Sequence, residues 1–417
     1  MKTKSLDTPH TARKSSKFSV SEELANGTSV SMVMLIDSLI ADAHARKASD
    51  IHIDPGQEEV RIRFRVDGLL EEECRFPTNI HTECIARLKI LAGLRTDEHF
   101  VAQDGRFRFT LSNNSWIDIR ISIAPTYYGE NAVLRLLSAN AGQQTFCELG
   151  IDAGQERSME RAVARGNGMI LVTGPTGSGK TTTLYALMRT LANGTMSLVS
   201  IEDPIEYSME GVSQIQANER TGLSFAHGLR SILRQDPDVI MVGEIRDAET
   251  AGLAVNAALT GHLVLSTLHT NDAPTTLLRL VDMRVEPYLI ASTVRLIIAQ
   301  RLVRRICKEC KRQRNITESE RSELSQQFEN GAHIPDTLSE GSGCAACNGS
   351  GYRGRIGVYE FLVVTSPLQE ALARRLSEQE LRVLAISEGM GSMEMDGLQK
   401  IEEGHTTIEE VLRIRHE

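Results

Sequence analysis

The residues best suited to chemistry lie in a glycine-rich segment, ILVTGPTGSGKTTTLYALM, at positions 170–188. The pattern G-x-x-x-x-G-K-T follows an apolar run and opens a helical pattern, which favours a P-loop over a chance glycine-rich turn. Backbone N–H groups of such a loop wrap the phosphates of ATP, its lysine reaches the β- and γ-phosphates, and its threonine hydroxyl ligates Mg²⁺. The predicted nucleotide-binding residues are Gly174, Pro175, Thr176, Gly177, Ser178, Gly179, Lys180, Thr181 and Thr182.

Acidic residues follow two further apolar runs. Residues 238–247 read DVIMVGEIRD, so Gly243 occupies the position where P-loop hydrolases commonly carry an aspartate for Mg²⁺, and Glu244 comes next. Glu202 follows another run. We expect Glu244 to reach the Mg²⁺ shell and Glu202 to act as the base or to position the attacking water, although the pattern leaves open which glutamate has which role. For each acid alone, a solvated loop residue or a helix cap is the alternative.

Two histidines, His262 and His269, flank a third apolar run. A histidine at a strand end that faces phosphate can donate a hydrogen bond to the γ-phosphate and report its loss. We expect this sensor role for His269, and leave it open for His262, since an isolated strand-end histidine is often structural.

Cysteines form a second site. Two C-x-x-C pairs, separated by 33 intervening residues, each supply half of a tetrahedral thiolate cage, and together they predict a closed structural Zn²⁺ site. A redox dithiol would explain one pair but not two. The predicted ligands are Cys307, Cys310, Cys344 and Cys347, whereas Cys74, Cys84 and Cys147 lack ligand spacing and are expected to be inert thiols.

The elements that must position these groups alternate between strand and helix. Short apolar strands are expected at 169–173, 197–201, 239–242 and 262–267, with helical stretches between them. This alternation predicts an α/β fold with a parallel sheet, and ligands bind such sheets at the carboxyl ends of the strands. The two glutamates and His269 are therefore expected at one rim, beside the P-loop.

A different pattern precedes this sheet. Helical spacing of apolar residues predicts a helix from about 30 to 48, and period-two alternation predicts strands at 51–53, 60–66 and 116–123, with a turn at Asp67-Gly68. Residues 28–140 thus form a predicted α+β domain whose sheet has one polar, arginine-rich face. Residues 1–27 are expected to be a solvated flexible arm, with a short amphipathic docking element as the alternative.

The remaining boundaries follow from composition. We expect a linker at 141–149, the P-loop core at 150–305, a basic zinc-binding insertion at 306–357, and a helical C-terminal part at 358–417 with helices around 367–388 and 406–415.

Bulk composition argues against several classes of protein. The 417 residues contain 41% hydrophobic but only 4% aromatic residues, so large cores must be built mainly from aliphatic side chains. No run approaches the ~18 uncharged apolar residues of a spanning helix, and no secretory signal is evident, so a cytoplasmic protein is expected. A net charge of −9 argues against a phosphate-tracking nucleic-acid binder.

The motifs resemble those of the type II secretion and type IV pilus assembly ATPases over nearly the whole of residues 30–415. The resemblance rests on ASDIHIDP (48–55), RFRVDG (63–68), QDGRF (103–107), YYGENAVLRLL (127–137), GPTGSGKTTTLY (174–185), IEDPIEY (201–207), LRQDPDVIMVGEIRDAETA (233–251), LTGHLVLSTLHTNDA (259–273) and QRLVRRIC (300–307). In that family these segments include the Walker A motif, the aspartate box, an atypical Walker B motif and the histidine box.

The resemblance implies a RecA-like P-loop ATPase domain, a smaller N-terminal domain, and a hexameric ring. It also implies that Arg120 and Arg135 point at the γ-phosphate as arginine fingers, for which sheet-surface salt bridges are the alternative. Secretion members carry a further N-terminal docking domain, and the roughly 27 residues that precede the shared region here depart from that pattern. Retraction ATPases lack the cysteine cluster, which favours assembly or secretion.

The expected function is therefore a motor that uses ATP, Mg²⁺ and Zn²⁺ to drive pilus or pseudopilus assembly and protein secretion. Its expected partners are an inner-membrane platform protein and a membrane protein's cytoplasmic docking domain, which would make it peripheral to the inner membrane. A RecA-like nucleic-acid translocase or DNA-uptake motor is the main alternative, and the acidic total counts against it. A nucleotide-dependent scaffold without turnover is a further one.

Overall fold

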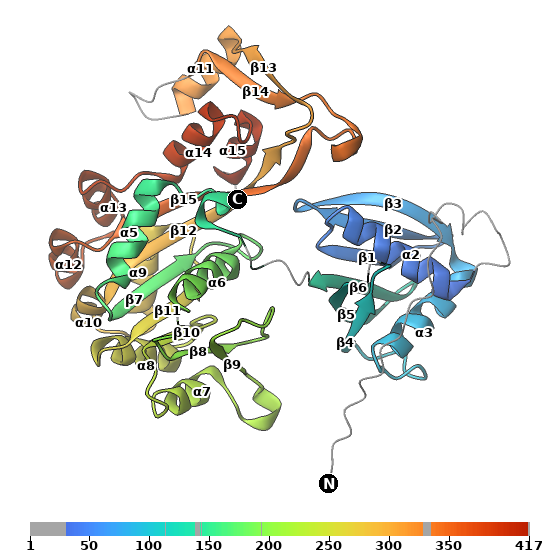
Figure 1. Ribbon diagram of the computed structural model, residues 1–417, viewed down its shortest axis with the longest axis horizontal. Coiled ribbons are helices and arrows are strands. Elements are labelled where there is room, and N and C mark those ends of the chain that lie inside the picture. Colours follow the sequence, from blue (N-terminus) through green and yellow to red (C-terminus); the bar gives the residue numbers. More distant parts are fainter. Residues whose placement is uncertain are drawn as a thin grey trace. The chain divides into compact units, whose positions relative to one another are not determined.

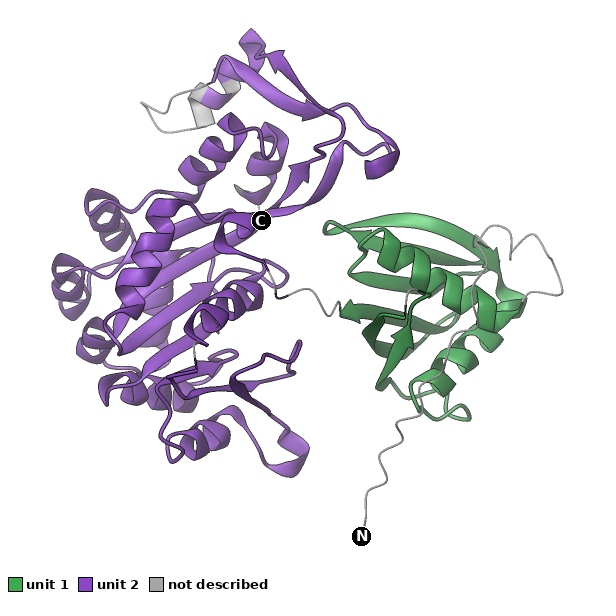
Figure 2. Ribbon diagram, in the orientation of Figure 1, with its two compact units in different colours: residues 1–141 green, residues 142–417 purple. Residues whose placement is uncertain are grey.

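The structure is a computed structural model that describes residues 31–415, apart from 113, 138–141, 143, 193 and 328–334 (Figure 1). The chain divides into two compact units, residues 1–141 and 142–417 (Figure 2). The expected arm at 1–27 lies outside the described residues. Within the described part, no helix is both long enough and apolar enough to cross a bilayer.

Unit 1 is a six-stranded antiparallel sheet in the order β3-β2-β1-β6-β5-β4, with α2 and α3 packed on one face. The predicted helix and strands are confirmed, and β3, β4, β6 and α3 are additional. The element bounds are α2 (Met32–Ala45), β1 (Asp50–Pro55), β2 (Glu59–Val66), β3 (Leu69–Pro77), α3 (His81–Leu91), β4 (Gln103–Thr110), β5 (Trp116–Thr126) and β6 (Gly129–Leu137), with a 3₁₀ turn at Thr78–Ile80.

The predicted turn joins β2 to β3. Asp67 and Gly68 both have positive φ, 49° and 94°. Two-residue hairpin turns require this backbone to match the twist of the strands, and aspartate followed by glycine supplies it at low cost.

The arginine-rich face of this sheet is also confirmed. Alternate residues of β1, β2, β5 and β6, such as Ile62, Ile119 and Leu134, are buried against α2 and α3. The intervening residues lie on the other face, where register places arginines opposite one another across adjacent strands. One cross-strand row consists, in order, of Arg106, Arg120, Arg135, Asp50 and Arg65, and is called the arginine row below.

Unit 2 is built on a seven-stranded sheet in the order β15-β12-β7-β11-β10-β8-β9. Neighbouring strands are parallel except β12 and β15, which are antiparallel. The α/β fold with a parallel sheet is therefore confirmed. The strands are β7 (Gly168–Thr173), β8 (Leu198–Glu202), β9 (Val212–Gln216), β10 (Val239–Val242), β11 (Leu263–Leu268), β12 (Val294–Ile306) and β15 (Tyr352–Val363).

Helices cover both faces of this sheet (Figure 1). Apolar residues of α5 and α6 form one core with one face, and those of α7 to α10, α12 and α13 form a second core with the other. These helices are α5 (Ala153–Val163), α6 (Lys180–Leu191), α7 (Phe225–Ile232), α8 (Ala248–Leu259), α9 (Ala273–Asp282), α10 (Pro287–Thr293), α12 (Ser366–Ala373) and α13 (Glu378–Ser387), and a short α4 (Phe146–Leu149) precedes them.

The end of the chain is more finely divided than the sequence predicted. One helix expected at 367–388 is two, because Arg375 adopts φ 58° and Ser377 caps α13 through a hydrogen bond to the N–H of Glu380. The predicted final helix is confirmed as α15 (Ile408–Arg415), and α14 (Met393–Glu402) was not predicted. Both pack with the antiparallel pair of β13 (Lys311–Asn315) and β14 (Thr337–Gly341) and with α11 (Glu318–Gln327), which connects these two strands.

Candidate functional site

The P-loop joins the end of β7 to the start of α6. Gly174, Gly177 and Gly179 have φ of 142°, 81° and 87°, conformations that residues with a Cβ rarely adopt. α6 begins at Lys180 without a side-chain cap, so its first N–H groups and its positive helix end face the loop. This is the geometry of a phosphate site.

The Lys180 side chain folds back against the backbone of the P-loop. Its Nζ donates to the carbonyl oxygens of Gly174 and Pro175 at 2.8 and 2.9 Å. Burial lowers the pKa of Lys180 to about 8, although the charge of Glu244 opposes this shift. A partly desolvated ammonium group is weakly screened by water, so its electrostatic attraction to an arriving polyphosphate is strong.

Glu244 lies just past the end of β10. Its Oε1 pairs with Arg246 at 2.5 Å and its Oε2 lies 3.4 Å from His269 Nε2, and its side chain keeps some exposure to solvent. β8, β10 and β11 are neighbours, so the sheet brings Glu202, Glu244 and His269 to adjacent strand ends. The structure thus places these three residues at one rim of the sheet, as expected.

The backbone also shows why a glycine precedes this acid. A Cβ at Gly243 would lie 3.3 Å from both the Cα of Glu202 and the carbonyl oxygen of Ile201, which is tighter than most Cβ contacts. Thr267 Oγ1 further fixes this segment by donating to the Gly243 carbonyl at 2.7 Å. Close packing of β8 against β10 thus disfavours an aspartate at 243, and the acidic side chain comes one residue later.

Glu202 is held differently. It ends β8 and is only 3% exposed, and its carboxylate accepts hydrogen bonds from Tyr185 on α6, from Ser200 Oγ at 2.5 Å and from Gln214 Nε2 at 3.2 Å. Burial, with the charge of Glu202, raises the pKa of Tyr185, which therefore stays a donor. These donors tie the P-loop helix to β8 and β9.

The two histidines differ in position. His269 follows β11 and contacts Glu244 at the rim. His262 precedes the same strand, and its Nδ1 contacts the Ala257 carbonyl at 2.9 Å and Thr260 Oγ1 at 3.3 Å. Six residues of strand separate them by roughly 20 Å. The structure therefore does not bring His262 to the rim, and the structural alternative fits it.

A chain of buried hydroxyl groups links the P-loop strand to the segment after β11. Thr173 Oγ1 lies 2.6 Å from Thr270 Oγ1, which lies 2.6 Å from Thr276 Oγ1 on α9. The N–H of Thr270 also donates to Thr173 Oγ1 at 2.9 Å. This chain of hydroxyl groups was not predicted from the sequence, although threonines at the ends of two apolar runs were a usable signal.

In unit 1, Arg120 and Arg135 are direct cross-strand partners in the arginine row. Like charges opposite each other destabilise a sheet, so such a pair suits a site that binds an anion. Arg135 Nε donates to Asp50 Oδ1 at 3.1 Å, and its side chain is 60% exposed. Asp50 is buried and also lies 3.6 Å from Arg65, so it braces two arginines at once.

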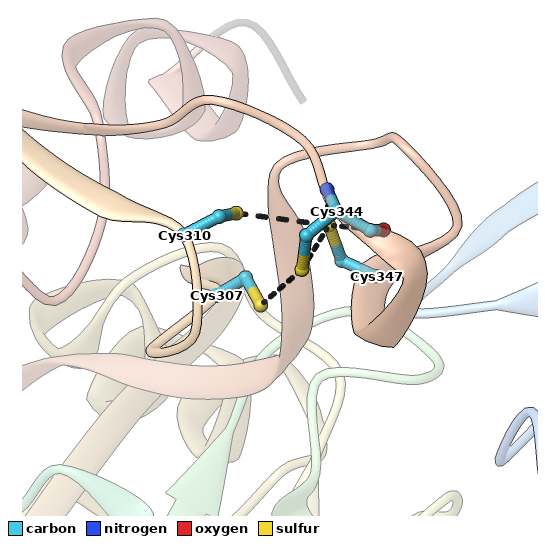
Figure 3. Close-up of side chains that lie close together, drawn as sticks. All are labelled: Cys307, Cys310, Cys344 and Cys347. Carbon is cyan, nitrogen blue, oxygen red and sulfur yellow. Dashed lines mark hydrogen bonds between the residues drawn. The ribbon is translucent and has the colours of Figure 1, made fainter.

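The four predicted cysteine ligands come together (Figure 3). All their Sγ atoms lie within 4.8 Å of one another, with Sγ–Sγ distances of 3.9 Å for Cys307–Cys344, 3.8 Å for Cys310–Cys347 and 3.7 Å for Cys344–Cys347. A tetrahedral ion with bonds of about 2.3 Å would separate its sulfur ligands by about 3.8 Å. The N–H groups of Cys344 and Gly351 point at Cys347 Sγ and support a thiolate.

Comparison with known proteins places this site in a family. The family model described as "Type II/IV secretion system protein" matches residues 26–413. The chain is 44% identical to the type IV pilus assembly ATPase PilB of Myxococcus xanthus, with 91% of this chain and 67% of that protein covered. It is also 44% identical to type II secretion system protein E of Pseudomonas aeruginosa, with 93% and 76% covered.

Solved structures of two ATPases are similar in fold to this chain. The crystal structure of the pilus retraction motor PilT with bound ADP is 27% identical, with a TM-score of 0.61 and coverage of 91% of this chain and 96% of that one. The Legionella pneumophila ATPase DotB, at 24% identity and a TM-score of 0.67, shares the fold over 92% of this chain and 95% of its own. None of these matches supports the nucleic-acid translocase. With its P-loop, rim carboxylates and cysteine cluster, this chain belongs to the type II/IV secretion system protein family and is an ATPase.

Proposed function

We propose that the chain is a ring-forming motor ATPase, homohexameric and peripheral to the inner membrane from the cytoplasmic side, which drives pilus or pseudopilus assembly and protein secretion. The observation that carries this proposal is the convergence of Lys180, Glu244 and His269 at the end of a parallel sheet in a chain that is 44% identical to a pilus assembly ATPase. The partners we propose are an inner-membrane platform protein and the cytoplasmic domain of a membrane protein.

The proposed roles follow from the contacts. The loop from Gly174 to Thr182 would hold the phosphates of ATP. The Thr181 hydroxyl would ligate Mg²⁺, and Glu244 would reach the ligand shell of that ion. Glu244 keeps some solvent exposure, whereas the Glu202 carboxylate accepts bonds from three protein donors. We therefore propose that Glu244 acts as the general base and reaches the Mg²⁺ shell, whereas Glu202 holds the end of β8 in position. His269 senses the γ-phosphate through Glu244, and Arg120 and Arg135 contact that phosphate.

Replacing Lys180 with alanine tests the function. We expect K180A to abolish hydrolysis, because no other group would neutralise the β- and γ-phosphates from within the loop. The gene should be deleted in its native bacterium and complemented with wild type or K180A. Restored surface pili or secretion by wild type but not by K180A supports the proposal. The control is K47N, which changes an exposed lysine of unit 1 at a position with φ 58°, a backbone conformation that asparagine tolerates. Full restoration by K180A would contradict it.

We further propose that Cys307, Cys310, Cys344 and Cys347 hold a structural Zn²⁺. The four sulfur donors leave no open position, so the ion would supply stability rather than catalysis. We expect one zinc per chain by metal analysis, and its loss in C344S with a fall of the melting temperature. C147S, at an exposed cysteine far along the chain from this cluster, should keep the metal. Zinc at unchanged stoichiometry in C344S would rule out this ligand set.

A further inference from the structure

Gln300 is a buried polar side chain in the middle of an apolar strand. It lies on β12, in the run VRLIIAQRLV, and is 1% exposed. An unpartnered amide at such a position would be strongly destabilising. Its neighbour Ala299 pairs with Thr173, the last residue of β7, so Gln300 lies beside the point where the P-loop begins.

Both ends of this amide are used. Gln300 Nε2 donates to the carbonyl oxygen of Ser178 at 2.7 Å, and Gln300 Oε1 accepts from Thr183 Oγ1 on α6 at 2.7 Å. The partners define the orientation of the amide, because the opposite one would place two oxygen atoms against each other. The Gln300 side chain therefore joins the P-loop to the first turn of α6, the helix that follows the loop.

The loop is also shaped to receive this residue. A Cβ at Gly174 would lie 2.4 Å from the Gln300 carbonyl oxygen, and a Cβ at Gly179 would lie 2.9 Å from Gln300 Nε2. Two of the P-loop glycines are thus required by the approach of β12 as well as by their backbone angles. Gln300 and the loop form one packed unit.

The bond to Ser178 has a directional consequence. A peptide unit is planar and trans, so its C=O and the following N–H point in opposite directions. Holding the Ser178 carbonyl toward β12 therefore holds the Gly179 N–H toward the opposite side of the loop. Phosphate binding in P-loops depends on such N–H groups being aimed before the ligand arrives.

We propose that Gln300 is a positioning residue of the nucleotide site, which fixes the Ser178–Gly179 peptide so that the Gly179 N–H faces the bound phosphate. The inference rests on the proposed nucleotide site at the P-loop. Gln300 does not touch the nucleotide; it acts through the loop. Its loss should weaken nucleotide binding much more than turnover at saturation.

The test uses the full chain and ADP with Mg²⁺. Q300M keeps the volume and removes both hydrogen bonds, and we expect it to raise the Kd about tenfold, which corresponds to about 1.4 kcal/mol. T183V, which spares the bond to Ser178, should raise it about threefold. T190V is the matched control on α6, because among the contacts of the described residues the Thr190 hydroxyl bonds to its own helix at Ala186. Without nucleotide, amide hydrogens of residues 174–180 should exchange several-fold faster in Q300M only.

Q300E provides an independent readout. Its carboxylate can still accept from Thr183 but cannot donate to Ser178, whereas its protonated form can do both. The Kd defect relative to wild type should therefore shrink from pH 8 to pH 6, a dependence that a purely structural defect would not show. Wild-type Kd and exchange in Q300M, or a Q300E defect independent of pH, would overturn the proposal. If K180A also bound ADP normally, the nucleotide site itself would be wrong.

Discussion

Replacing Glu244 with glutamine is expected to lower kcat for ATP hydrolysis by about 100- to 10,000-fold, the range in which a positioned general base contributes. Glutamine keeps the shape of the side chain but cannot take a proton from water. The Kd for ATP should stay within about threefold of wild type, because Lys180 and the loop still bind the phosphates. Phosphate release and binding of a fluorescent ATP analogue measure the two quantities.

Two controls separate this role from its alternatives. E249Q changes an exposed glutamate on α8 that pairs only with Arg230 among the contacts described, and should leave kcat unchanged. E202Q should lower the melting temperature, since it disturbs a buried carboxylate bonded to Tyr185, Ser200 and Gln214. A normal kcat in E244Q together with a 100-fold loss of kcat in a folded E202Q would show that Glu202, rather than Glu244, acts as the base.

Replacing Arg135 with alanine should lower kcat by about 1,000-fold or more, as expected for a guanidinium that stabilises charge on the transferred phosphoryl group. Lysine at this position should restore only part of the rate, because it lacks the planar fork that binds two oxygens. Asp50 keeps Arg65 as a neighbour, so the fold of unit 1 should survive.

The matched control for Arg135 is Arg108 on the same sheet face. It pairs with Asp118 and its guanidinium lies 3.8 Å from the centre of the Trp116 ring, so it already has local partners. R108A should retain the wild-type rate. Wild-type kcat in both R120A and R135A would favour the sheet-surface alternative for this pair.

The features predicted well from the sequence are those specified by neighbouring residues. The P-loop strand, the Asp67-Gly68 turn and the alternating strands of unit 1 each depend on a short local pattern. The cysteine cluster joins two segments far apart in the chain, but its paired C-x-x-C spacing carries the information locally.

Contacts between distant segments were not predicted. Gln300 is separated from Ser178 by 122 positions, and in the sequence it is one of several polar residues in a strand that is otherwise apolar. Glu202 reads as a rim acid, and its burial depends on Tyr185 and Gln214, which come from two other elements.

We propose that ATP binds at the rim of the unit 2 sheet and that Arg120 and Arg135 contact its γ-phosphate in the assembled protein. A structure of the assembled protein with a non-hydrolysable ATP analogue and Mg²⁺ tests this most directly. We predict that Arg120 or Arg135 lies within hydrogen-bonding distance of the γ-phosphate in at least one subunit. Both guanidinium groups turned away from that phosphate in every subunit would contradict the claim.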